Sequence, residues 1–73
     1  MDGNQKTVPV REEGIVLEAL PALLFKVRIG ADREILGHLA GKMRLHHIRV
    51  LPGDRVLLEM GPDGRRGRIV RRL

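Results

Sequence analysis

The chain has 73 residues, no cysteine and a single aromatic residue, Phe25, and its 14 lysines and arginines against nine acids give a formal net charge of +5. This length allows one domain with a thin core, and the lack of cysteine excludes disulfides and thiolate zinc sites. No segment has the apolar length of a membrane span, and residues 1–6 lack the apolar core of a signal peptide, so we expect a cytoplasmic protein without membrane contact.

The N-terminal residues differ in character from the rest of the chain. Residues 1–13 are polar, contain Gly3 and Pro9, and follow no helical period. They predict a flexible tail that precedes a single domain over residues 14–73.

Three segments of alternating hydrophobicity follow, and Pro21 separates the first from the second. Alternation with a period of two residues is typical of half-buried strands. Phe25 is in register with the apolar residues before and after it, so we expect it in the core. Gly37 inside the third segment predicts a bulge or a sharp bend. The three predicted strands cover residues 15–20, 23–29 and 35–39.

A connector and two more strands complete the domain. Residues 40–45 leave room for one helical turn, which is too short to form without tertiary contacts. Pro52 and Gly53 suit the two central positions of a type II turn, because glycine accepts a positive φ there. Further strands are predicted over residues 55–60 and around residues 69–70.

Three strands, a helical connector and two strands predict an all-β domain. Five short strands must close on themselves, because an open sheet would leave unpaired edges and a bare apolar face. The five-stranded Greek-key barrel known as the OB-fold has this layout, with its connector between strands 3 and 4. An SH3-like barrel is the alternative that the pattern leaves open.

Residues of catalytic type are scarce in this chain. Serine and cysteine are absent, Thr7 lies in the predicted tail, and no glycine-rich phosphate loop occurs. His46 and His47 are adjacent, with His38 eight residues earlier, and no acid lies at ligand spacing beside them. The sequence therefore predicts no enzyme activity, no metal site and no cofactor.

The basic side chains are concentrated in the second half of the chain. Residues 1–34 hold five bases and six acids, whereas residues 35–73 hold nine bases and three acids. This asymmetry favours a polyanionic partner. Because Phe25 is predicted to be buried, docking onto structured RNA through phosphates is a better fit than base stacking on aromatic rings. The bases expected to border one face are Lys42, Arg44, Arg49, Arg65, Arg66, Arg68, Arg71 and Arg72.

Several short motifs resemble bacterial translation initiation factor 1. They are Gly-Lys-Met-Arg at 41–44, Ile-Arg at 48–49, Gly-Asp at 53–54 and Gly-Arg-Ile at 67–69, and the likeness runs over residues 14–72. The resemblance implies an OB-fold that occupies the aminoacyl-tRNA site in the decoding region of the small ribosomal subunit. It further implies a monomer without catalytic activity that contacts ribosomal RNA and a neighbouring ribosomal protein and acts with initiation factors 2 and 3.

The resemblance also implies which side chains contact ribosomal RNA. They are Lys42, Met43, Arg44 and Arg49, with Arg68 and Arg72 on the same surface. We add His47, which stands where the family usually has an aromatic residue, and the basic loop residues Arg65 and Arg66.

The chain departs from the family pattern at several positions. Ala40 stands where serine is usual, which removes a helix cap worth about 1 kcal/mol. The loop over residues 61–66 is shorter and more basic than usual, and Arg71 replaces a common aromatic residue. These departures leave open a divergent paralogue with another RNA target.

Two further functions remain as alternatives. A general single-strand RNA chaperone would bind unstructured oligonucleotides as tightly as ribosomal subunits. A protein-binding β-barrel adaptor would use exposed Leu24, Leu36 and Leu57 as its contacts, and its affinity would be insensitive to salt.

Overall fold

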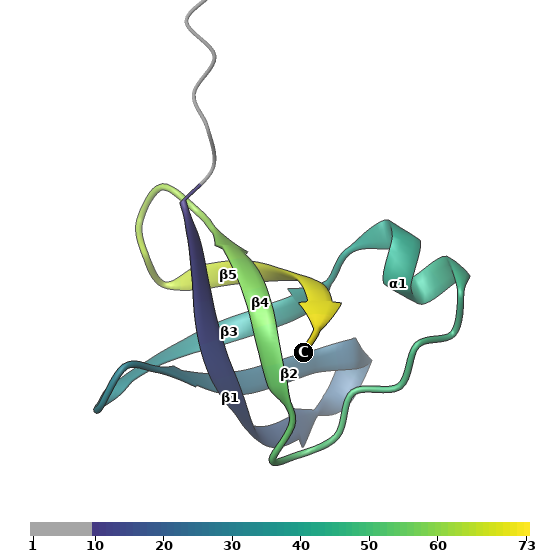
Figure 1. The fold of residues 1–73 in the computed structure, drawn as a ribbon, viewed down its shortest axis with the longest axis horizontal. Helices are drawn as coiled ribbons and strands as arrows, with labels where there is room; N and C mark the ends of the chain where they lie inside the picture. Colours follow the sequence, from purple (N-terminus) through teal and green to yellow (C-terminus); the bar gives the residue numbers. More distant parts are fainter. Residues whose placement is uncertain (1–9) are drawn as a thin grey trace, which may run out of the picture.

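The computed structural model describes residues 10–73, so most of the predicted tail, residues 1–9, lies outside the described residues. The described residues form five strands and one short α-helix, and the helix lies beside the strands in Figure 1. The elements in chain order are β1 (Arg11–Leu20), the 3₁₀ turn η1 (Pro21–Leu23), β2 (Leu24–Ile29), β3 (Arg33–Leu39), α1 (Gly41–Leu45), β4 (Arg55–Met60) and β5 (Arg66–Arg72).

The five strands form a closed barrel in the order β1-β2-β3-β5-β4, and β1 also pairs with β4. All pairs are antiparallel except that of β3 with β5, which is parallel. Helix α1 and the loop after it lead from β3 to β4 outside the barrel wall (Figure 1). This arrangement confirms the predicted OB-fold, and the SH3-like alternative is wrong.

The barrel interior is filled by one set of apolar side chains. The alternation predicted for β2, β3 and β4 is confirmed, and Phe25 is only 4% exposed. Leu23 does not continue this face, because it lies in η1 and is 55% exposed. The buried core consists of Val16, Phe25, Val27, Ile29, Ile35, Leu39, Met43, Val50, Val56, Leu58 and Ile69.

The first strand begins earlier than predicted. β1 starts at Arg11, so its first three residues lie within the segment predicted as a flexible tail. These residues pair with β4, where Arg11 is opposite Glu59 and Glu13 is opposite Leu57. Because the three residues are polar, the apolar alternation that located the other strands does not extend to them.

The predicted bulge at Gly37 is absent, because the register of β2 with β3 is continuous from Leu24 to Ile29. A Cβ atom at Gly37 would lie 3.1 Å from Cγ2 of Val27 and 3.3 Å from Cδ1 of Ile69. Glycine therefore serves close packing at this position. The register shifts lie elsewhere, in β1 after Val16 and between β4 and β5.

The turn before β4 fastens the connector to the barrel. Gly53 has a φ of 93°, and Asp54 N–H donates to Leu51 O at 3.0 Å, as expected for the predicted type II turn. Gly53 N–H also donates to Val16 O at 2.7 Å.

Neither helical segment of residues 10–73 has the length and hydrophobicity needed to cross a bilayer.

Candidate nucleic-acid interface

Helix α1 is held to the barrel by its central residue. Met43 is 2% exposed and belongs to the core, and Ala40 N–H donates to Ile69 O at 2.9 Å. Ala40 supplies no side-chain cap, so tertiary contacts hold the helix, as predicted. The side chain of Met43, for which an RNA contact is predicted, packs into the core between two exposed basic neighbours.

The end of α1 contains a residue in a left-handed conformation. His47 has a φ of 54°, its N–H donates to Arg44 O at 3.2 Å, and Ile48 N–H donates to Met43 O at 3.0 Å. These two bonds form a Schellman motif, in which glycine is usual at the left-handed position. A non-glycine residue in the left-handed conformation raises the conformational free energy by about 1 kcal/mol. The imidazole of His47 is exposed at the end of the helix.

Strand β5 carries bases on its outer surface. Gly67 and Ile69 are buried, whereas Arg66 and Arg68 are exposed. The register shift between β4 and β5 then places Arg71 opposite Leu57. Since side chains alternate across a strand, the inner residues of β5 complete the core while its outer arginines form part of the molecular surface.

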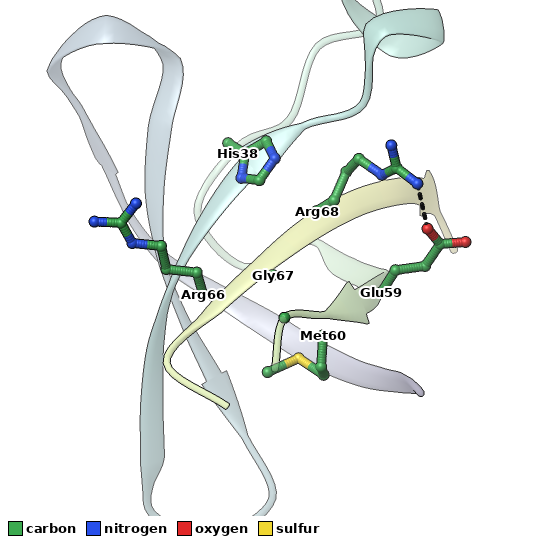
Figure 2. Close-up of a pocket in the computed structure, with 7 residues that line it drawn as sticks. His38, Glu59, Met60, Arg66, Gly67 and Arg68 are labelled. Carbon is green, nitrogen blue, oxygen red and sulfur yellow. Dashed lines mark hydrogen bonds and ion pairs between the residues drawn. The ribbon is translucent and has the colours of Figure 1, made fainter. Parts of the chain in front are cut away.

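Three hollows adjoin one another on this side of the barrel. The first is lined by His38, Glu59, Arg66 and Arg68, together with the β4–β5 corner. Figure 2 shows that His38 extends from β3 beside the outer arginines of β5, and it is opposite Arg68 in the parallel pair. This hollow therefore spans three strands.

The second and third hollows connect the first one to α1. The second shares Glu59 and Arg68 with the first and reaches Lys42 on the helix. The third shares Lys42 and Arg71 with the second. We call the continuous surface the basic face, and its charged and histidine side chains are Arg11, His38, Lys42, His46, Glu59, Arg66, Arg68, Arg71 and Arg72.

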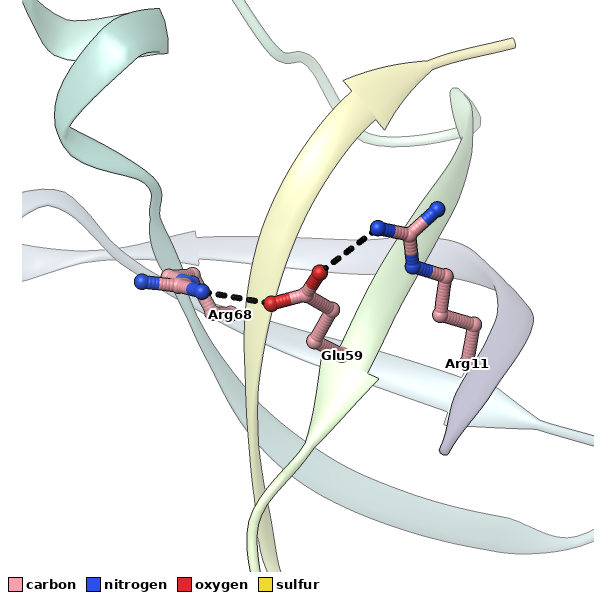
Figure 3. Close-up of polar contacts among 3 residues, drawn as sticks. All are labelled: Arg11, Glu59 and Arg68. Carbon is pink, nitrogen blue, oxygen red and sulfur yellow. Dashed lines mark hydrogen bonds and ion pairs between the residues drawn. The ribbon is translucent and has the colours of Figure 1, made fainter. Parts of the chain in front are cut away.

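One carboxylate lies within the basic face and bridges two arginines. Glu59 accepts hydrogen bonds from Nη2 of Arg11 at 2.9 Å and from Nη2 of Arg68, and its side chain is 12% exposed. Figure 3 shows Glu59 of β4 between an arginine from β1 and one from β5. The hydrogen bond from Arg68 and then that from Arg11 hold the pKa of Glu59 below its ordinary value of 4.5, against the opposing effect of desolvation.

The remaining predicted site residues have three different placements relative to the basic face. Arg49 lies beside the basic face, because Arg72 Nη1 donates to its carbonyl oxygen at 2.9 Å. Arg44 and His47 are exposed on the connector but line none of the three hollows. Arg65 lines a separate hollow with Lys26 and does not join the basic face.

The three histidines are all exposed on the surface. His38 lines the first hollow and His46 the third, and His47 is exposed after α1. Within residues 10–73, no three side chains of histidine, cysteine, aspartate or glutamate lie close enough to hold a metal ion.

Sequence reasoning missed Arg11 and Glu59. Arg11 lies in the segment predicted as a tail, and Glu59 alternates with core residues of β4, which indicates only a solvent-facing position. Arg11 and Glu59 are 48 positions apart in the chain, and the pairing of β1 with β4 that closes the barrel brings them into contact. The alternation in β4 places Glu59 on the outer surface, but no local signal identifies its partners.

Comparisons with known proteins match this chain to one family and to solved structures. A family model described as "Translation initiation factor 1A / IF-1" matches residues 4–73. The chain is similar to the solution structure of translation initiation factor 1 from the Wolbachia endosymbiont strain TRS of Brugia malayi, with 40% identity, a TM-score of 0.76 and coverage of 94% of this chain and 83% of that chain. It is also similar to the crystal structure of YjeQ from Thermotoga maritima, with 29% identity and a TM-score of 0.71, over 88% of this chain but 23% of that chain.

Proposed function

Because the chain belongs to the translation initiation factor 1A / IF-1 family, we propose that this translation initiation factor binds the aminoacyl-tRNA site in the decoding region of the small ribosomal subunit. The proposal assigns it a binding role in the cytoplasm, without a catalytic step. It contacts ribosomal RNA and a neighbouring ribosomal protein and acts as a monomer with initiation factors 2 and 3.

The observation that supports this proposal is the gathering of bases from separate parts of the chain on one face. Lys42 of α1 lines a hollow with Arg68 and Arg71 of β5, and the adjoining hollows add Arg66 and Arg72. Arginine forks and a lysine ammonium at neighbouring positions suit the closely spaced phosphates of folded RNA. Arg44, His47 and Arg49 of the connector extend the proposed contact, whereas Met43 supports it from within the core.

The alternative of general single-strand binding receives less support. Such proteins stack bases on exposed aromatic rings, and Phe25, the one aromatic residue of this chain, is buried. The adaptor alternative is also weakened, because its proposed contacts Leu24, Leu36 and Leu57 are half-buried rather than exposed.

Co-sedimentation with small and large ribosomal subunits across a salt series tests the proposal. We expect saturable binding to small subunits, loss of binding as salt rises, and competition by an occupant of the aminoacyl-tRNA site. Footprinting should protect the decoding region. Equal binding to both subunits, or an unchanged footprint there, would contradict the proposal.

Replacement of Arg68 by alanine tests the basic face directly. Loss of one phosphate contact should weaken binding to small subunits and reduce the slope of log K against log salt by about 1. Arg28→Ala is the matched control, because Arg28 is an exposed arginine of β2 that lines a different hollow. Equal losses of affinity in the two variants would indicate that binding depends on the net charge of the protein rather than on the basic face.

A further inference from the structure

Among the described residues, 10–73, Glu59 is the only carboxylate that lines the three hollows of the basic face. It occupies the boundary between the first and second hollows, and it bridges Arg68 of β5 and Arg11 of β1 (Figure 3). An acid at this position opposes the attraction of a polyanion. The positive charge of the surface therefore does not explain why a carboxylate lies at this position.

A carboxylate and a phosphate offer an arginine similar acceptors. Each has oxygen atoms that receive the parallel N–H groups of a guanidinium. Glu59 already holds one Nη2 of Arg68 and one of Arg11, and with its side chain 12% exposed it is partly shielded from water. A phosphate that approaches the Nη2 atom of either arginine meets a donor already bound to Glu59 and a carboxylate that repels it.

We propose that Glu59 is a specificity-determining residue of the RNA-binding face, where it acts as an internal anion that competes with phosphate for Arg68 and Arg11. The inference rests on the proposed function, since it concerns which RNA that face accepts. A flexible single-stranded RNA loses conformational freedom for each phosphate that binds at a fixed position. Its binding free energy therefore improves little at two arginines whose charge Glu59 already neutralises in part. A folded RNA presents several phosphates in fixed positions, and these can bind the neighbouring lysine and arginine side chains of the basic face at the same time.

The test compares two RNA ligands with the wild-type chain and with Glu59→Gln. The ligands are a single-stranded oligouridylate and the small ribosomal subunit. We expect the variant to bind the oligonucleotide at least about threefold more tightly at about 50 mM salt, with a salt slope steeper by about 0.7 for the phosphate gained. Binding to the subunit should change less, so the ratio of the two affinities falls.

Glu18→Gln is the matched control. Glu18 is also an ion-paired carboxylate, with Lys26 at 3.6 Å, but it lines none of the hollows of the basic face. The two substitutions change the net charge equally. If the inference holds, the oligonucleotide affinity of Glu18→Gln stays close to that of the wild type. Glu59→Thr, a neutral residue with high β-propensity, replaces the glutamine variant if circular dichroism shows that the latter is unfolded.

The outcomes separate the inference from the proposed function. An unchanged or weaker oligonucleotide affinity in the Glu59 variant, or an equal gain in the Glu18 variant, overturns the role of Glu59 while wild-type binding to small subunits stands. Failure of the wild-type chain to bind small subunits overturns the proposed function, whatever the variants do with the oligonucleotide.

Discussion

Strand β5 and the connector, which supply most of the basic face, are attached to the molecule in different ways. Strand β5 is hydrogen-bonded on both edges, to β3 and to β4. Backbone-to-backbone hydrogen bonds join the connector over residues 40–54 to the strands only near its ends, through Ala40, Gly53 and Asp54, and a single side-chain bond runs from Arg72 Nη1 to Arg49 O. Between those ends, the buried side chains of Met43 and Val50 are its apolar anchors.

This difference shows that equal charges need not contribute equally to binding. The arginines of β5 have positions set by strand pairing, so their order depends on the stability of the whole barrel. The bases of the connector depend on a few apolar contacts and can lose order while the barrel stays folded. Substitutions without any change of charge should therefore separate the two regions.

The largest effect is expected when Met43 is replaced by alanine. Truncation of this buried side chain should cost about 2–5 kcal/mol of stability. Part of that loss should be local, since α1 has no side-chain cap and no other buried residue. We expect hydrogen exchange at the amides of α1 to rise more than at those of β5, and binding to small subunits to fall although no charge is removed.

Met60→Ala is the control for this prediction. Met60 lies on β4, is half-buried and packs against the core, so its truncation affects the barrel wall. It should lower the global free energy of unfolding without selective exchange in α1. If the two methionine variants have the same exchange pattern, then the connector is no less firmly attached than β5.

A smaller effect is expected when Gly67 of β5 is replaced by alanine. The added Cβ would lie 3.1 Å from Cδ1 of Ile35 and from Cδ2 of Leu58, and 3.2 Å from Sδ of Met60. These side-chain ends must shift, at a cost of about 1–3 kcal/mol measured by denaturant unfolding.

Gly41→Ala makes the same chemical change in the connector. A Cβ there meets no atom within 4 Å, and the position requires no positive φ. Alanine should therefore leave the free energy of unfolding unchanged or raise it by about 0.4–1 kcal/mol. If Gly41→Ala lowers the free energy of unfolding as much as Gly67→Ala does, then the backbone at Gly41 is packed as closely as that at Gly67.

The same contrast explains how much of the fold could be predicted from the sequence. The strands that line the core have apolar residues at every second position, and this period located β2, β3 and β4 and the burial of Phe25. The beginning of β1 has no such signal, because residues 11–13 are polar and are held by pairing with β4. Of the bulge or sharp bend predicted at Gly37, the bulge is wrong, because a glycine in a strand has the same local signature whether it serves a bulge or close packing.

The candidate site was predictable in its charges but not in its geometry. The resemblance assigns Met43 to RNA together with its basic neighbours, and only the packing of α1 against the barrel reveals that it points into the core. The bridge from Glu59 to Arg11 depends on the register that closes the barrel. Register between distant strands follows from tertiary packing, which no local pattern specifies.

A modest gain in stability is expected from Ala40→Ser. Ala40 precedes α1 in an extended conformation, with φ −62° and ψ 151°, and offers no side-chain acceptor to the first turn. A serine hydroxyl could accept a hydrogen bond from a free backbone N–H there and should stabilise the protein by about 1 kcal/mol, measured by thermal unfolding. Ala31→Ser, in the exposed turn before β3, should leave the melting temperature unchanged. An equal rise in both variants would mean that capping is not the cause.

The smallest expected effect is a pH dependence that belongs to the barrel wall rather than to the connector. Arg68 and Arg11 lower the pKa of Glu59 in the folded state below its ordinary value of 4.5. A carboxyl group with a depressed folded pKa contributes stability above its unfolded pKa, and this contribution is lost as the pH falls from about 4.5 through the folded pKa. Melting temperatures measured between about pH 7 and pH 3 should therefore fall less steeply for Glu59→Gln than for the wild type, with the gap between the two curves constant above about pH 5 and narrowing below it. Because the bridge joins β1, β4 and β5, the acid-induced loss should appear in the exchange of strand amides as much as in that of α1. Parallel curves for the two proteins would show that the bridge contributes nothing to folding, and would leave competition with phosphate as the only effect of this carboxylate.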